Sequence, residues 1–120
     1  MEHEIIISIA SNENQEANLA KARELLVTII PKLTFTNELW TEPVNTTRKN
    51  MYLNQLCKGM TELGPNLLSE VLKETERRLG RKHNEDGIVV IDLDLLQYDE
   101  QRFHNKDWER SYVKDLIKEL

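Results

Sequence analysis

Two aspartates, Asp92 and Asp94, stand two positions apart in the apolar run 88–96 (IVVIDLDLL). If this run is a strand, its alternation places both carboxylates on one face and turns the intervening apolar residues towards the core. Mg²⁺ takes one or two carboxylates together with waters and substrate phosphates, so the pair suits a nucleotide-bound metal. Solvent-facing aspartates on a half-exposed sheet explain the same pattern, and for the pair alone this is the preferred interpretation.

A second same-face pair, Tyr52 and Asn54, lies in the run 51–60. The tyrosine offers a ring for stacking, and the amide both donates and accepts hydrogen bonds, so together they suit a flat heterocycle. A strand aromatic that covers core beside a solvated polar neighbour explains the pair equally well. Taken alone, the pair favours this structural interpretation.

Other chemical motifs are missing or unspecific. His3, His83 and His104 have unrelated spacings, which do not indicate a metal site. The sequence has no phosphate-binding Gly-x-x-x-x-Gly-Lys-[Ser/Thr] loop and no Gly-x-Ser-x-Gly nucleophile motif. The charged cluster from Glu76 to Lys82 is typical of a solvated helix end, where cations complement the helix dipole.

Composition limits the class of protein. A chain of 120 residues predicts a single domain over 1–120. Its formal charge of -5, from 16 Lys+Arg against 21 Asp+Glu, argues against a nucleic-acid partner. No apolar run approaches the roughly 20 residues of a membrane span, and no secretory signal opens the chain. We therefore expect a cytoplasmic protein, and we expect it to be a monomer. Cys57 is the single cysteine, so no internal disulfide can form.

The elements that must position these residues follow from periodicity and punctuation. The expected strands cover 4–10, 33–40, 51–60 and 88–96, and the expected helices end at Pro31, run from Pro65 to Gly80, and cover 108–120. Ser11, Asn12 and Asn14 are candidate caps of the first helix, and Asp107 of the last. The order predicts an α+β fold, a ferredoxin-like βαββαβ sandwich with a C-terminal helix. We expect four antiparallel strands, two helices on one face and the third near the open face.

Short motifs follow one another along nearly the whole chain: Ile9-Ala10-Ser11-Asn12, Ala17-Asn18-Leu19, Trp40-Thr41-Glu42-Pro43-Val44, Tyr52-Leu53-Asn54, Glu76 with Leu79-Gly80-Arg81, Ile91-Asp92-Leu93-Asp94-Leu95-Leu96, and His104-x5-Arg110-x-Tyr112. In this order they resemble the motifs of the 6-hydroxymethyl-7,8-dihydropterin pyrophosphokinases of folate biosynthesis. The order is more specific than any single motif.

The resemblance implies transfer of pyrophosphate from ATP to the hydroxymethyl group of a reduced pterin, releasing AMP. It implies that two Mg²⁺ ions are held by Asp92 and Asp94. The implied roles of the remaining residues are pterin binding by Thr41, Val44, Tyr52, Asn54 and Tyr112, ATP binding by Glu76, Arg81, His104 and Arg110, and catalysis by Arg81 and His104 together with the two aspartates.

The chain departs from the family in the loop before the aspartates. Family members carry Arg, Trp-Gly-Pro and a second Arg there, whereas this chain has Lys82-His83-Asn84-Glu85-Asp86-Gly87-Ile88-Val89-Val90. Cationic clamps stabilise the charge that spreads during phosphoryl transfer, and Lys82, Arg81 and Arg102 are candidate substitutes. Two hypotheses therefore stay open: a minimal pyrophosphokinase, and a catalytically weak or inactive pterin- or nucleotide-binding module on the same fold.

Overall fold

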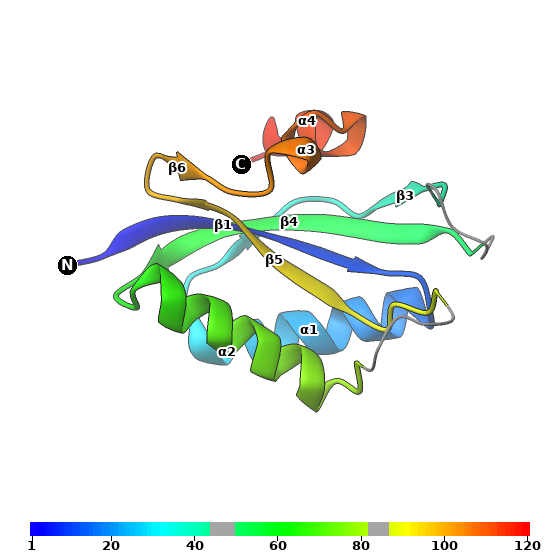
Figure 1. Ribbon diagram of the computed structural model, residues 1–120, viewed down its shortest axis with the longest axis horizontal. Helices are drawn as coiled ribbons and strands as arrows, with labels where there is room; N and C mark the ends of the chain where they lie inside the picture. Colours follow the sequence, from blue (N-terminus) through cyan, green and yellow to red (C-terminus); the bar gives the residue numbers. More distant parts are fainter. Residues whose placement is uncertain (44–49, 82–86) are drawn as a thin grey trace.

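The computed structural model describes residues 1–43, 50–81 and 87–120. Its elements are β1 (His3–Ser11), α1 (Gln15–Ile29), β2 (Thr34–Phe35), β3 (Leu39–Thr41), β4 (Tyr52–Thr61), α2 (Pro65–Arg78), β5 (Asp92–Tyr98), β6 (Gln101–Arg102), α3 (Asn105–Trp108) and α4 (Ser111–Ile117). They form one antiparallel sheet in the order β2-β4-β1-β5-β6, with β3 also paired to β4. Helices α1 and α2 cover one face, and α3 and α4 lie over the other (Figure 1). The predicted ferredoxin-like α+β sandwich is confirmed.

The central strand β1 is buried on both faces. Ile5, Ile7 and Ile9 join the core beneath α1 and α2, whereas Ile6 joins a second, smaller core beneath α4. The run of β-branched residues in β1 therefore matches its place between β4 and β5. Because both neighbouring strands pair with β1, its register decides which of their side chains lie side by side.

Helix α2 begins and ends where the sequence predicts. Pro65 occupies its first turn, where a missing N–H costs no hydrogen bond, and Gly80 follows its end with a φ of 95°. Leu68, Leu72 and Thr75 form its buried face against the sheet. The spacing of the apolar residues therefore identified this helix and its orientation correctly.

The expected strand 33–40 is wrong as a continuous element, because it is divided into β2 and β3. Between them, the Thr36 backbone N–H donates to the Leu56 carbonyl at 2.9 Å, and the Thr36 hydroxyl accepts from the Leu56 N–H at 3.0 Å. The Gln55 amide also donates to the Thr36 carbonyl, at 2.7 Å. A side-chain oxygen thus takes the place of a backbone carbonyl, which interrupts the ladder.

The expected strand 88–96 begins later, at Asp92, and continues to Tyr98. Its first part is held instead by Asn12, whose Oδ1 accepts from the Val89 N–H at 2.6 Å and whose Nδ2 donates to the Gly87 carbonyl at 2.8 Å. Asn12 is therefore a tether of this segment rather than a helix cap. Asn14 does occupy the cap position of α1, but with a φ of 44° and no capping side-chain bond.

The expected closing helix 108–120 is two short helices, because Arg110 is extended (φ -70°, ψ 140°) between α3 and α4. Asp107 lies inside α3 and does not cap α4, whose cap position is Arg110. The predicted apolar face survives the break: Leu116 is buried, and Trp108, Tyr112 and Leu120 pack against the same small core.

Replacing Thr36 with valine should lower the free energy of unfolding by about 1–3 kcal/mol, because the buried Leu56 N–H loses its acceptor. Urea denaturation measures the loss. The control is Thr28→Val, which removes an exposed hydroxyl that bonds the Leu25 carbonyl within α1, and should cost less than about 0.5 kcal/mol. Equal losses in the two variants would contradict the role assigned to Thr36.

Candidate functional site

The face of the sheet opposite α1 and α2 has an apolar half and a polar half. Ile6, Leu56 and Leu96 lie in the apolar half and are covered by Val113 and Leu116 of α4. The polar half is a pocket of about 200 Å³, here called the open-face pocket, lined by Ser8, Ala10, Thr41, Glu42, Tyr52, Asn54, Asp92, Asp94, Asp107, Arg110 and Tyr112. The helix that completes the small core therefore begins beside the polar recess, at Arg110 and Tyr112.

The register across three strands brings the predicted residues together. Ala10 on β1 pairs with Asp92 on β5 and with Asn54 on β4, and Ser8 pairs with Asp94. The short side chains of Ser8 and Ala10 lie between the aspartates and the asparagine, which leaves room above β1. Both predicted same-face pairs, Asp92 with Asp94 and Tyr52 with Asn54, line this one pocket.

Two tyrosines line the pocket from different elements, Tyr52 from β4 and Tyr112 from α4. Burial raises the pKa of the Tyr52 phenol and raises that of Tyr112 to about 12, so both rings stay neutral at physiological pH. Asn54 lines the same pocket, and its amide is fixed because its Nδ2 donates to the Thr41 hydroxyl at 2.8 Å and to the Leu39 carbonyl at 3.1 Å. The arrangement offers aromatic rings and a fixed amide to a flat polar molecule.

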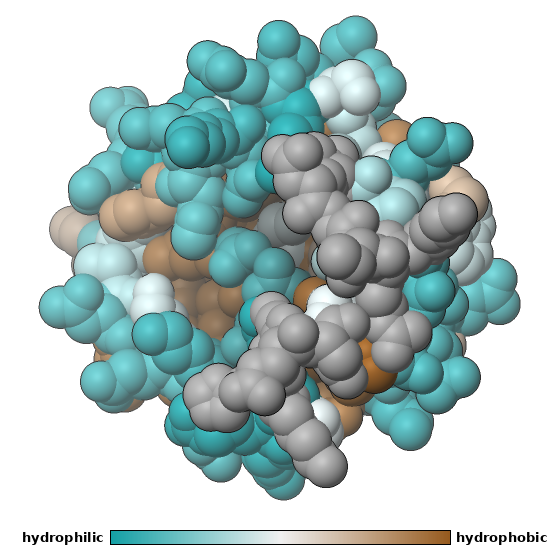
Figure 2. Space-filling model, turned by 45° about the vertical axis from the view of Figure 1, so that its right-hand side comes forward, coloured by the Kyte–Doolittle hydropathy of each residue, from teal (hydrophilic) through white to brown (hydrophobic). Residues whose placement is uncertain are grey.

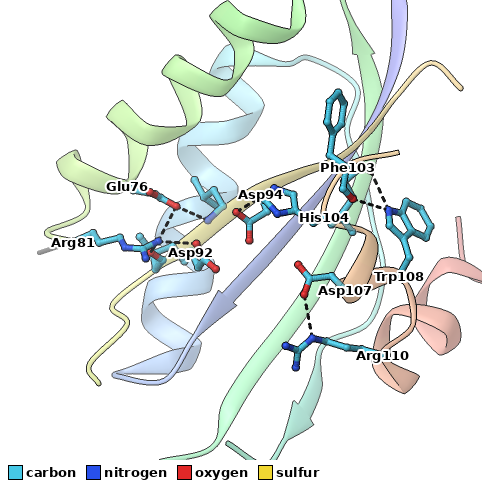
Figure 3. A network of polar contacts seen from close by, with 12 residues as sticks. Glu76, Arg81, Asp92, Asp94, Phe103, His104, Asp107, Trp108 and Arg110 are labelled. Carbon is cyan, nitrogen blue, oxygen red and sulfur yellow. Dashed lines mark hydrogen bonds and ion pairs between the residues drawn. The ribbon is translucent and has the colours of Figure 1, made fainter. Parts of the chain in front are cut away.

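Negative charge accumulates around Asp94. Its pKa is raised to about 8, first by burial and then by the neighbouring carboxylates of Asp92 and Asp107. His104 approaches from the start of α3, with its Nε2 3.8 Å from Asp94 Oδ1 (Figure 3). A carboxylate in these surroundings is stabilised in its charged form by any cation that enters the pocket.

Asp92 belongs to a network that joins α2 to β5. Arg81 Nη1 donates to Asp92 Oδ1 at 2.6 Å and to Glu76 Oε2 at 3.0 Å, and Glu76 Oε2 also accepts from the Leu93 N–H at 2.7 Å (Figure 3). Burial is the largest cause of the raised pKa of the Glu76 carboxyl. Glu76 therefore satisfies a backbone donor at the edge of β5 and holds Arg81 against Asp92.

Asp107 is a pocket residue that sequence reasoning missed, because it was interpreted as a helix cap. Its Oδ1 accepts from Arg110 Nε at 3.0 Å, so the two residues form an ion pair on the rim of the open-face pocket (Figure 3). The i to i+3 spacing of the two residues was visible in the sequence, but nothing there indicated that they face the aspartates.

A second recess lies between α2 and β5, here called the edge groove. One part is lined by Pro65, Asn66, Ser69, Leu72, Leu95, Phe103 and His104, and the other by Glu76, Arg77, Arg81 and Asp92; Lys73, Leu93 and Asp94 line both. Figure 2 shows a hollow with a hydrophobic floor and a hydrophilic rim. It lies on the side of the molecule that carries α2 and β5 at the front of Figure 1. Asp94 thus lies where the edge groove meets the open-face pocket.

Three residues that the sequence proposed for the site are not placed there by the structure. Val44, predicted to line the pterin site, and Lys82, a candidate clamp, lie outside the described residues. Arg102, the other candidate clamp, lies over the ring of Trp108 with its guanidinium carbon 4.1 Å from the ring centroid. That cation–π contact turns Arg102 towards the small core instead of Asp94.

The donor set around Asp94 fits Mg²⁺ that arrives with a ligand. Within the described ranges, no three acidic, histidine or cysteine side chains are arranged to hold a metal ion. Asp92 and Asp94 nevertheless present two carboxylates to one pocket, and their crowded negative charge favours a divalent cation. Mg²⁺ is commonly held by one or two carboxylates with phosphate oxygens supplying further ligands.

Comparison with known families decides how the site is interpreted. The family described as 7,8-dihydro-6-hydroxymethylpterin-pyrophosphokinase matches residues 6–120. The chain belongs to this family. The match begins in β1 and includes every element after it, so the elements that build the open-face pocket and the edge groove all lie within the family's domain.

Curated relatives are plant proteins. A mitochondrial folate synthesis bifunctional protein of Arabidopsis thaliana is 37% identical over 126 residues, which cover 93% of this chain and 22% of the relative. A second Arabidopsis folate synthesis bifunctional protein is 33% identical over 92% of this chain and 25% of its own length. A mitochondrial one of Pisum sativum is 29% identical over 99% of this chain and 25% of its own length. The chain therefore spans about a quarter of the relatives it matches.

Among the residues that the structure describes, no helix has the length and apolar character needed to cross a membrane.

Glu76→Ala should lower the free energy of unfolding by about 1–3 kcal/mol without any ligand present, since the Leu93 N–H and Arg81 lose a shared acceptor. Chemical denaturation of the ligand-free protein measures this. The matched control is Glu74→Ala on the same helix, where an exposed pair with Arg77 is removed and the expected cost is less than about 0.5 kcal/mol. A Glu76 variant as stable as the control would show that the network does not join α2 to β5.

Proposed function

We propose that this chain transfers the pyrophosphoryl group of ATP to the hydroxymethyl group of a reduced pterin and releases AMP. The observation that carries the proposal is the meeting of two recesses at Asp94: an aromatic, polar pocket on the sheet face and a groove along the edge of β5. A transferase for two substrates needs two such sites that share one reacting centre. Membership of the pyrophosphokinase family and the folate synthesis relatives support this assignment.

The pterin occupies the open-face pocket in this proposal. Tyr52 and Tyr112 stack on its rings, and Asn54 bonds its polar edge from the floor of the pocket. Thr41 orients that amide through its hydroxyl and completes the pocket on the side of β3. A volume of about 200 Å³ is below the roughly 300–1,000 Å³ usual for ligand pockets and suits a small bicyclic molecule.

The nucleotide occupies the edge groove. Leu72, Leu95 and Phe103 supply an apolar lining for the base, and the polyphosphate runs along β5 towards Asp94. His104 lies beside that aspartate, and Arg81 lines the groove at the far end. Arg110 lies on the opposite side, on the rim of the pterin pocket, so cations lie on both sides of the transferred group.

Asp92 and Asp94 are proposed to hold two Mg²⁺ ions, which would offset the charge of the phosphates when bound. The hydroxymethyl oxygen forms a bond to the β-phosphorus, the bond from that phosphorus to the oxygen bridging the α-phosphate breaks, and AMP leaves with this oxygen. The hydroxymethyl proton is released as the new bond forms. The role of the protein is to position the reacting groups. Arg81 and Arg110 orient the phosphate oxygens, and the pterin slot orients the hydroxymethyl group towards the phosphates.

Glu76 holds a positioning role here. Its Oε2 already accepts from the Leu93 N–H and Arg81, so it acts on the nucleotide through Arg81. The ATP-binding role implied for Glu76 by the resemblance stays a prediction.

The cytoplasmic location also stays a prediction, because two of the three relatives are named mitochondrial. We also propose that the protein works as a monomer, as expected from the sequence.

Release of AMP from ATP, Mg²⁺ and the reduced hydroxymethylpterin, followed in a coupled assay, tests the proposed activity. Asp94→Ala should abolish release and leave pterin affinity nearly unchanged, because the slot's rings and amide come from β4 and α4. Asp115→Ala, on the exposed side of α4, is the charge-matched control and should retain activity. Pterin binding by the wild-type chain without any ATP- and Mg²⁺-dependent turnover would favour the binding-module hypothesis instead.

Tyr112→Ala should weaken pterin binding by roughly 1–3 kcal/mol, the range found for stacking of bases on aromatic rings. Isothermal titration calorimetry measures the affinity. Tyr112→Phe is the control, since it keeps the ring and removes the phenol oxygen, and should retain most of the affinity. Unchanged binding by the alanine variant would exclude Tyr112 from the pterin site.

A further inference from the structure

The phosphate end of the proposed nucleotide site needs positive charge, and the loop before the aspartates lacks the family's two arginines in this chain. Asp92, Asp94 and Glu76 already line the groove where the polyphosphate would lie, so the local charge opposes an anion. The residues that line the two recesses are the other source of cations. Among the described residues, those cations are Lys73, Arg77, Arg81 and Arg110.

The three arginines are already paired within the protein. Arg81 donates to Asp92 at 2.6 Å and to Glu76 at 3.0 Å. Arg110 pairs with Asp107 at 3.0 Å. Arg77 donates to Glu74 through Nη2 at 2.6 Å and through Nε at 3.0 Å. A phosphate that recruits any of them competes with a carboxylate for the same donors, which reduces the net gain.

Lys73 differs from these arginines, since its side chain makes no hydrogen bond or ion pair with any residue in the described part of the chain. It is exposed on α2, and it lines both parts of the edge groove together with Asp94. Arg77 follows it by four positions, so both side chains leave the same side of the helix. A ligand with an apolar end near Leu72 and a charged end at Asp94 must pass Lys73.

We propose that Lys73 binds the phosphate chain of the nucleotide and supplies part of the positive charge that the family's loop arginines would bring. This inference rests on the proposed function, because it needs a nucleotide in the edge groove. A flexible lysine ammonium can reach a phosphate oxygen without breaking an existing ion pair, and charge-assisted hydrogen bonds are the stronger kind. Arg102, in contrast, is held over Trp108 and lines neither recess.

Calorimetric titration with α,β-methylene-ATP and Mg²⁺ tests this role without turnover. In this analogue a carbon replaces the oxygen that bridges the α- and β-phosphates, so the bond that breaks in the reaction is absent. Lys73→Gln should raise the dissociation constant about tenfold, which corresponds to about 1.4 kcal/mol. It should also flatten the dependence of affinity on salt, since one charged contact is removed. Lys73→Arg, which keeps the charge, should bind within about threefold of the wild type, or about 0.65 kcal/mol.

The matched control is Arg78→Gln, which makes the same change in net charge on the same helix at an exposed residue that lines neither recess. It should change affinity less than twofold. Equal binding by Lys73→Gln and the wild type, or equal losses in Lys73→Gln and Arg78→Gln, would overturn the role of Lys73 while leaving the proposed function intact. Absence of nucleotide binding by the wild type would overturn both. Thermal unfolding midpoints of all variants verify that the fold is kept.

Discussion

The site depends on a conflict within the central strand. β1 lies between β4 and β5 and must bury side chains on both faces, yet the open-face pocket needs empty space directly above it. Ser8 and Ala10 resolve this conflict, because they are short enough to leave room while the alternating isoleucines fill the core beneath α1 and α2. One strand therefore supplies the main hydrophobic contact of the fold and the floor of the pocket.

The edge of β5 carries a second constraint. An edge strand exposes backbone donors, and here the Leu93 N–H is satisfied by a helix carboxylate, Glu76, which also holds Arg81. The same carboxylate thus closes the edge and places a cation on Asp92. Because β6 pairs only with Gln97 and Tyr98, the first part of β5 has no strand on its outer side among the described residues, and the groove between it and α2 stays accessible.

The sequence predicted features that depend on neighbouring residues, and it missed features that depend on contacts between residues far apart in the chain. The period of two placed Asp92 and Asp94 on one face, and Pro65 with Gly80 bounded α2, because these are local preferences of a strand or a helix. The Asn12 tether on Val89 spans 77 positions and interrupts no local pattern, so nothing in the sequence indicated it. Thr36 likewise divides a strand only through its contact with Leu56. Asp107 and Lys73 became visible as site residues only when α3 and α2 were placed beside β5.

The pairing of β1 with β5 shifts register between Ile6 and Ile7, so Leu96 has no partner across from it while Leu95 and Gln97 do. This irregularity lies at the border between the polar and apolar halves of the open face, after both aspartates. A change of length at the irregularity would be absorbed there, whereas one added or deleted residue between Val89 and Asp92 would turn both carboxylates towards α1 and α2. The bulge thus separates the segment that leads into α3 and α4 from the aspartates, whose face is fixed by their spacing from the segment that Asn12 holds.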